Sequence, residues 1–294
     1  MMTNDKSTLS NLLAAQDAIA RLEAGAELAS APLRDGLRAR LACREAAGWL
    51  AHHGSWVHPL DLALRADGLT GSYAAAELGT RLGSVLPVTL ALGAPPAPPE
   101  DRDVATALRH ADQWQRLAAL RTWQPADVGP LPDDDGTPAL LAAAHLTTAP
   151  GGMRLTAAAV LRAAWLWRER GGTGEPGLLL WSAPVQRLHR AALAADPVPP
   201  LLGAMAEAAL AARRELARLR AAEARGRAVA VTSRSHLPQA LDVVIARPVV
   251  TARMLADRLA LSLPSAGDLL RQLVAAGVLR EGTGRKSWRG FVVV

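Results

Sequence analysis

Apolar residues, mostly Ala and Leu, recur along much of the chain at the three- and four-residue spacing of an amphipathic helix. Residues 9–44 predict two helices that separate near Pro32, and residues 101–121 predict another. A longer helix is predicted from Leu201 to about Arg227, after the stretch DPVPP. Because Ala and Leu are also strong helix formers, we expect a mainly α fold.

Two short segments interrupt this pattern and divide the chain. Residues 93–100 (GAPPAPPE) hold four prolines, which exclude a helix and indicate a linker. Residues 233–238 (SRSHLP) are typical of a hinge before the final segment. We therefore predict an N-terminal helical region over 1–92, a helical core over 101–231 that ends in a long basic helix, and a C-terminal domain over 235–294.

The C-terminal segment opens with helical signals at short intervals. Residues 237–246 predict one helix, and Thr251 is a good N-cap for a second helix over 252–259. Residues 260–262 are expected to form a tight turn, and Pro264 then stands in the first turn of a further helix, where its missing N–H costs nothing. Such a succession is typical of a helix-turn-helix.

The last helix should end near Ala276, because Gly277 is a natural residue for a left-handed helix end. Strands are expected after it, over 278–281 and 287–294, around a basic tip at 282–286. This order predicts a winged helix-turn-helix with a small β-wing. The core face of the last helix is expected to consist of Leu263, Leu269, Leu270, Leu273 and Val274.

In this motif the second helix enters the major groove, and its N-terminal residues meet base edges. Small Ser265 and Ala266 would permit a close approach, and Arg271 would contact a phosphate or a guanine edge. Asp268 would accept from a cytosine amino group or pair locally, and the cations of the wing would grip the backbone or the minor groove. The predicted contacts to double-stranded DNA are Ser262, Ser265, Ala266, Asp268, Arg271, Gln272, Arg280, Arg285, Lys286 and Arg289.

The formal net charge of +6 is unevenly distributed. Residues 1–212 hold 18 Lys and Arg against 21 Asp and Glu, residues 213–229 hold 6 against 2, and residues 232–294 hold 9 against 4. The positive excess therefore lies in the last third of the chain, as a phosphate-binding surface requires. Two alternatives stay open: an Arg-rich helix that is simply solvated, and a winged helix that contacts proteins or forms a dimer.

No catalytic residue, metal or cofactor is predicted. Residues 172–177 (GTGEPG) match a dinucleotide-binding glycine pattern but lack the strand that should precede it. His52, His53 and His58 do not have the spacing of a zinc site. The single cysteine, Cys43, fits a reducing compartment. Since neither a signal peptide nor a membrane-spanning apolar run is found, we expect a cytoplasmic protein without a membrane partner.

Two stretches resemble bacterial Fic-type proteins. Residues 139–184 are similar to the helix–loop–helix that carries the Fic signature HPFxxGNGR. Residues 247–294 are similar to the winged helix that often closes such chains, including the stretch LREGTGR at 279–285. Ala149 stands where the catalytic His would be, and only Pro150, a Gly and Arg154 match the rest of a shortened loop. The resemblance implies a Fic-like helical fold without the base that nucleotidyl transfer needs, a pseudoenzyme.

The resemblance is closer still to alphaproteobacterial proteins of unknown function that pair a degenerate helical region of this kind with a C-terminal helix-turn-helix. We therefore expect a DNA-binding transcriptional regulator, a homodimer whose helical N-terminal region mediates dimerisation, sensing or contact with a protein partner. Two alternatives are a Fic-related protein that binds a nucleotide near Arg154 and an antitoxin-like protein-interaction module.

Overall fold

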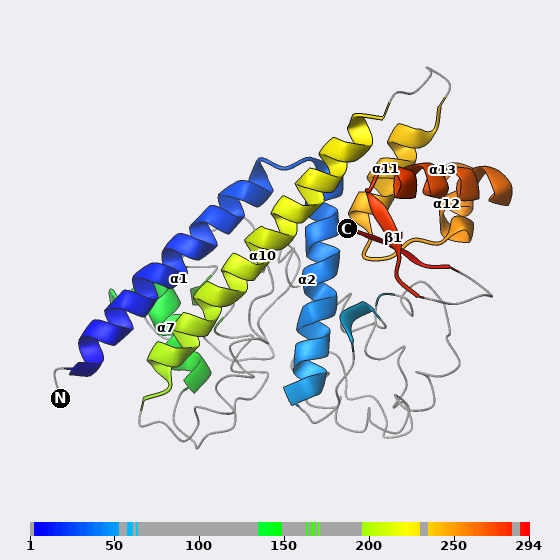
Figure 1. Ribbon diagram of the computed structural model, residues 1–294. Helices are drawn as coiled ribbons and strands as arrows, with labels where there is room; N and C mark the ends of the chain where they lie inside the picture. The colour runs from blue at the N-terminus through cyan, green and yellow to red at the C-terminus, as the bar shows by residue number, and fades with distance from the viewer. Residues whose placement is uncertain are drawn as a thin grey trace, which may run out of the picture. The chain divides into compact units, whose positions relative to one another are not determined.

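The computed structural model describes residues 3–52, 58–60, 63, 135–148, 163, 166, 167, 170, 196–229, 235–283 and 289–294. Over these residues the chain is mainly helical, as predicted, with a small two-stranded sheet near the C-terminus (Figure 1). In the same residues no helix has the length and apolar character to cross a membrane. The elements are α1 (Thr3–Glu27), α2 (Ala31–His52), α7 (Ala139–Thr148), α10 (Val198–Arg227), α11 (Leu237–Ala246), α12 (Ala252–Leu259), α13 (Leu263–Ala275), β1 (Leu279–Glu281) and β2 (Phe291–Val293).

Helix α10 begins at Val198, earlier than the predicted start at Leu201. The carboxylate of Asp196 accepts a hydrogen bond from the backbone N–H of Val198 at 3.1 Å, which satisfies a donor at the helix start. Pro199 and Pro200 then lie in the first turn, where a missing N–H leaves no hydrogen bond unmade. The prolines that were expected to precede the helix therefore open it.

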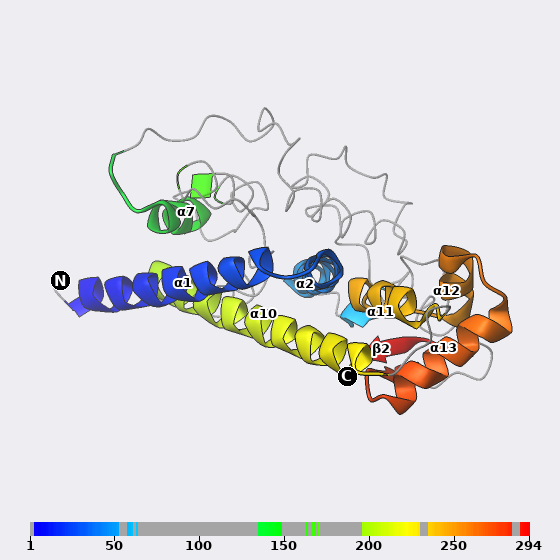
Figure 2. The ribbon, with the colours of Figure 1, turned by 90° about the horizontal axis from the view of Figure 1, so that it is seen from above.

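The chain forms two compact units, each assembled from segments distant in the sequence. The first unit comprises residues 1–24 and 41–212. Its described core includes Leu22, Leu140, Leu201 and Met205, which α1, α7 and α10 contribute. The first half of α1 and the start of α10 are joined by a hydrogen bond of 2.9 Å from Asn11 Nδ2 to the carbonyl of Pro199, and Figure 2 shows these parts of the two helices side by side.

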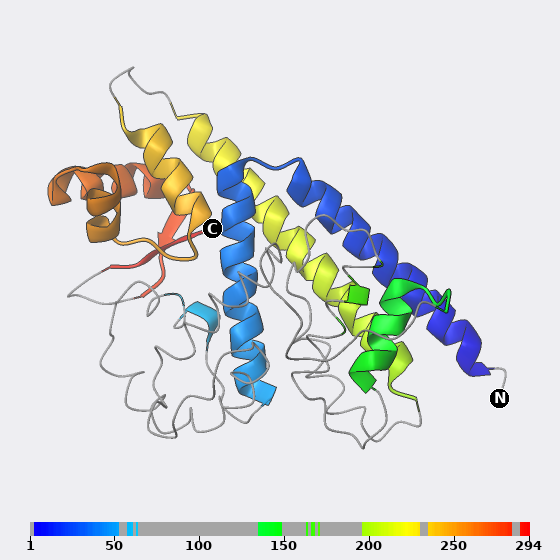
Figure 3. The same cartoon turned by 180° about the vertical axis from the view of Figure 1, so that it is seen from behind.

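The second unit comprises residues 25–40 and 213–294, so it contains the C-terminal helices and strands together with the first part of α2 and the second part of α10 (Figure 3). At Gly36 the backbone of α2 passes so close to α11 that an added Cβ would lie 2.1 Å from the carbonyl oxygen of Ile245. At Gly226 an added Cβ would lie 2.4 Å from the Leu241 side chain. Two glycines thus permit α2 and α10 to pack closely against α11.

Helices α11 and α12 have the predicted bounds. The Thr251 hydroxyl accepts from the backbone N–H of Met254 at 3.2 Å and caps α12. Helix α13 ends at Ala275, followed by Gly277 with a φ of +67°. The N–H groups of Gly277 and Val278 donate to the carbonyls of Val274 and Leu273, each at 2.9 Å. This pair of bonds is a Schellman helix end.

The hairpin after α13 lies where the sequence predicts a wing. Strands β1 and β2 are antiparallel, and Leu279 is paired with Val293 while Glu281 is paired with Phe291. Val250, from the segment between α11 and α12, forms an isolated antiparallel bridge to Phe291 through bonds of 3.0 and 2.8 Å. The strands are shorter than predicted. The bridge attaches the hairpin to the segment in which the helix-turn-helix begins.

Several predictions fall outside the described residues. They concern the proline-rich linker at 93–100, the loop from Ala149 to Arg154, the glycine pattern at 172–177, and the hairpin tip with Arg285 and Lys286. The resemblance of residues 139–184 to the Fic helix–loop–helix therefore stays a prediction.

Candidate nucleic-acid interface

A tight turn between α12 and α13 fixes the start of α13. Ala260 adopts the left-handed conformation, with a φ of 53°, and its N–H donates to the carbonyl of Ala256. The N–H of Leu261 donates to the same carbonyl at 2.9 Å. A left-handed alanine is uncommon, because its Cβ crowds the backbone, so the surrounding packing must hold this turn in place. The turn is where the sequence predicts it.

Ser262 caps the start of α13. Its hydroxyl oxygen accepts from the backbone N–H of Ser265 at 3.2 Å and lies 2.7 Å from the Ser265 hydroxyl oxygen. Pro264 occupies the first turn of the helix, as predicted. Both serines are exposed, as is Gln272 further along α13. The predicted contact residues Ser262, Ser265 and Gln272 are thus at the surface of the domain.

Ala266 is fully buried, so its prediction as a DNA contact is wrong. Ala266, Leu269, Leu270 and Leu273 repeat at the spacing of one helix face, and that face packs against the rest of the domain. The predictions of Leu263 and Val274 as core residues are also wrong, because their exposed fractions are 57% and 39%. Both lie outside the buried stripe, one near each end of α13. An apolar residue type alone did not distinguish the stripe from its margins.

Asp268 and Arg271 form an ion pair one turn apart on the exposed side of α13. Asp268 was expected either to accept from a cytosine amino group or to pair locally, and in the structure it forms the local pair. Both side chains stay more than half exposed, so a competing partner can reach them. The Arg271 guanidinium nevertheless has one nitrogen engaged before any base or phosphate approaches.

The hairpin carries the remaining predicted cations. Arg280, on β1, is exposed. Arg289, just before β2, is 67% exposed at its side chain and lies 3.7 Å from the carboxylate of Glu281 on the paired strand. Arg285 and Lys286 belong to the part of the tip that is not described. Arg280 and Arg289 are therefore the hairpin cations whose surface position the structure supports.

Two exposed arginines on α12, Arg253 and Arg258, were missed by the sequence reasoning. The first helix of a helix-turn-helix crosses the DNA backbone, so cations on its solvent side are placed to contact phosphates. The sequence could have shown them, because both arginines lie off the apolar face of α12. Leu255 and Ala256 are the buried residues of that helix. Among the described residues, neither arginine forms an ion pair.

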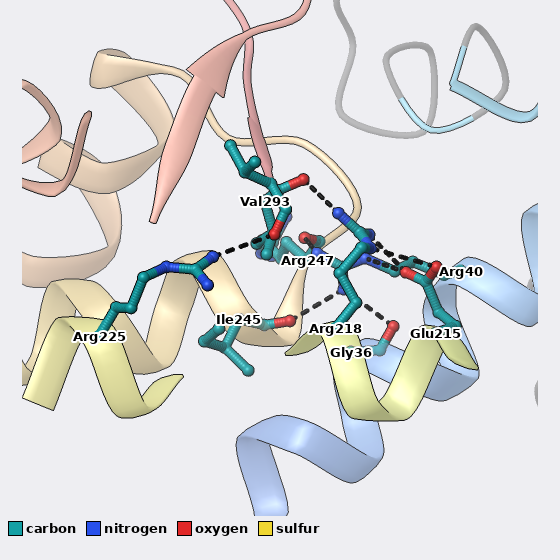
Figure 4. A network of polar contacts seen from close by, with 9 residues as sticks. Gly36, Arg40, Glu215, Arg218, Arg225, Ile245, Arg247 and Val293 are labelled. Carbon is teal, nitrogen blue, oxygen red and sulfur yellow. Dashed lines mark hydrogen bonds and ion pairs between the residues drawn. The ribbon is translucent and has the colours of Figure 1, made fainter. Parts of the chain in front are cut away.

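The Arg-rich end of α10 is not a free basic surface (Figure 4). Arg218 donates to the carbonyl of Val293. Arg225 donates to the carbonyls of Gly277 and Val294 at 2.9 and 3.2 Å. The hydrogen bonds of Arg220 and Arg227 go to Gly25 and Asp242 of the same unit. Four of the six arginines between 213 and 227 therefore hold the unit together, and the charge count over this segment overstates what is open to DNA.

A buried ion pair lies within the second unit. The Arg40 side chain is 7% exposed and that of Glu215 is 6% exposed, and Arg40 Nε lies 3.4 Å from Glu215 Oε1. Arg40 also donates to the carbonyls of Gly36, Ile245 and Arg247 at 2.9, 2.9 and 2.6 Å. Glu215 additionally accepts from Arg218 at 2.5 Å. We call Arg40, Glu215 and Arg218 the Arg40 network; it joins α2, α10, the end of α11 and β2 (Figure 4).

Comparison with known proteins identifies the C-terminal segment. Residues 237–294 match a family described as HTH DNA binding domain. The match begins at the first residue of α11 and includes α12, α13 and the hairpin. Among curated proteins, no similar chain is found. The chain thus carries a C-terminal helix-turn-helix DNA-binding domain, which confirms the helix-turn-helix that the sequence predicts.

Proposed function

We propose that this chain is a DNA-binding transcriptional regulator that contacts double-stranded DNA through α12, α13 and the hairpin. The observation that carries the proposal is the exposed, serine-capped start of α13 in a domain that matches a DNA-binding family. Exposed arginines on α12 and β1, Arg253, Arg258 and Arg280, supply cations for the phosphate backbone next to that helix.

The finer parts of the proposal rest on the sequence and on general principles of recognition. The hairpin would serve as a wing, with Arg285, Lys286 and Arg289 toward the backbone or minor groove. The helical N-terminal region would mediate dimerisation or sensing, without catalysis, since Ala149 offers no base. Because the protein acts on DNA, we propose that it works in the compartment that holds the DNA.

A homodimer is the proposed form on DNA. Regulators with this motif bind two half-sites about one helical turn apart, and the symmetry of the operator matches that of the protein. A footprint on the preferred duplex should therefore show two related half-sites, with a complex mass of two chains per duplex. A single half-site bound by one chain would contradict this part of the proposal and leave DNA binding itself intact.

The double variant Arg253→Ala, Arg258→Ala tests the DNA contact of α12. We expect weaker binding to all duplexes and a salt dependence whose slope falls by about 2, since each lost phosphate contact removes about one unit. Fluorescence anisotropy of a labelled duplex, titrated at several salt concentrations, measures both quantities. The variant Arg285→Ala, Lys286→Ala should show the same behaviour if the hairpin tip acts as a wing.

Arg21→Ala is the matched control, because Arg21 is an exposed arginine of α1 outside the DNA-binding domain. Its removal lowers the net charge without removing a proposed phosphate contact. Binding by wild-type protein that shows no salt dependence would sink the proposal. A loss of slope of about 1 for Arg21→Ala, the same loss per charge removed, would show that net charge acts, rather than the positions on α12.

A further inference from the structure

The start of α13 exposes a large apolar side chain. Leu263 is the first residue of the helix and is 57% exposed, and its neighbours Ser262, Pro264 and Ser265 are exposed too. A single exposed leucine is ordinary on a protein surface. Its position gives it meaning, because the N-terminal residues of the recognition helix meet the base edges in the major groove.

The polar groups near Leu263 are largely engaged within the protein. The Ser262 hydroxyl caps the helix and shares a hydrogen bond of 2.7 Å with the Ser265 hydroxyl. Asp268 and Arg271, the only charged residues of α13, neutralise each other. The helix therefore carries no net charge. Because Arg271 is already paired with Asp268, its guanidinium is not positioned in advance for a two-bond contact with a guanine edge.

We propose that Leu263 is a specificity-determining residue that contacts the C5-methyl group of a thymine in the major groove. Thymine is the base that presents a methyl group there, and apolar side chains are its usual partners. The inference rests on the proposed DNA-binding function. The start of α13 would contact the base, and the arginines of α12 and β1 would contact the phosphates.

The test removes the methyl group from the DNA and the side chain from the protein. The full chain first selects its preferred duplex from a random library. Each thymine of the selected site is then replaced in turn by deoxyuridine, which lacks only the C5-methyl group. At one thymine of each half-site we expect about a fourfold loss of affinity, the factor that corresponds to burying one methyl group, ~0.8 kcal/mol.

Leu263→Ala should bind the thymine and deoxyuridine duplexes equally at that position. Val274→Ala, which truncates an exposed apolar residue at the other end of α13, is the matched control and should retain the wild-type preference. Because both residues are exposed, neither change should unfold the domain, and thermal unfolding by circular dichroism checks this.

The outcomes separate this inference from the function on which it rests. Selective binding with no loss at any deoxyuridine overturns the role of Leu263 and leaves the DNA-binding function standing. A thymine preference that Leu263→Ala retains also overturns it, because another residue must then read the methyl group. Failure of the wild-type chain to bind any duplex overturns both.

Discussion

Arg40→Met should lower the free energy of unfolding of the second unit by about 3–5 kcal/mol, the cost of removing one partner from a buried ion pair. Methionine keeps an unbranched side chain but removes the guanidinium. Glu215, which is 6% exposed, would then lose the charge of Arg40 and keep that of Arg218. The carbonyls of Ile245 and Arg247 would lose donors at 2.9 and 2.6 Å.

Amide hydrogen exchange of α11 and α13 is the appropriate measurement, because it reports the stability of a single unit in a chain that has two. The double variant Arg40→Met, Glu215→Gln separates the two causes. If the loss of positive charge beside the buried Glu215 carboxylate dominates, the second change should restore part of the lost stability. If the lost bonds to the carbonyls dominate, it should restore none. Unchanged protection in Arg40→Met would contradict a structural role for the Arg40 network.

A matched pair of Gly→Ala substitutions should have effects of opposite sign. At Gly36 the new Cβ would lie 2.1 Å from the backbone oxygen of Ile245, so α2 and α11 must move apart. We expect a loss of about 1–3 kcal/mol, as for other overpacked sites. At Gly267, within α13, a Cβ meets nothing within 4 Å. There we expect a gain of about 0.5–1 kcal/mol, because alanine is the better helix former.

The same exchange measurement checks both variants, and each controls for the other. Destabilisation by Gly267→Ala would show that α13 is not helical at that point. A neutral Gly36→Ala would show that α2 does not approach α11 as closely as the structure has it. Gly36→Ala should also weaken DNA binding only as far as it lowers the folded fraction, because Gly36 lies outside the proposed contact surface.

The C-terminal domain could be predicted closely because its signals act over a few residues. Thr251 caps α12 by accepting from the N–H three residues later, and Gly277 adopts the left-handed conformation that ends α13. Residues 252–259 were predicted as a helix that Thr251 caps, and residues 237–246 as a helix that Pro248 ends, and both have those bounds in the structure. The errors concern the margins of a helix face. Ala266 and Leu263 differ in burial because of what packs against α13, and residue type does not carry that information.

The sequence by itself determined the helical class, the order of elements in the C-terminal domain and the turn that precedes α13, because hydrophobic spacing, the Thr251 cap and the position of Pro264 are local signals. Only the tertiary structure decided which charges have partners. Arg40 and the carbonyl of Ile245 are 205 residues apart, and no local pattern relates them. The arginines of α10 count as positive charge in the sequence, yet Arg218 and Arg225 are engaged by carbonyls of their own unit. Charge is a property of composition, whereas the availability of a charge depends on which distant backbone the fold brings beside it.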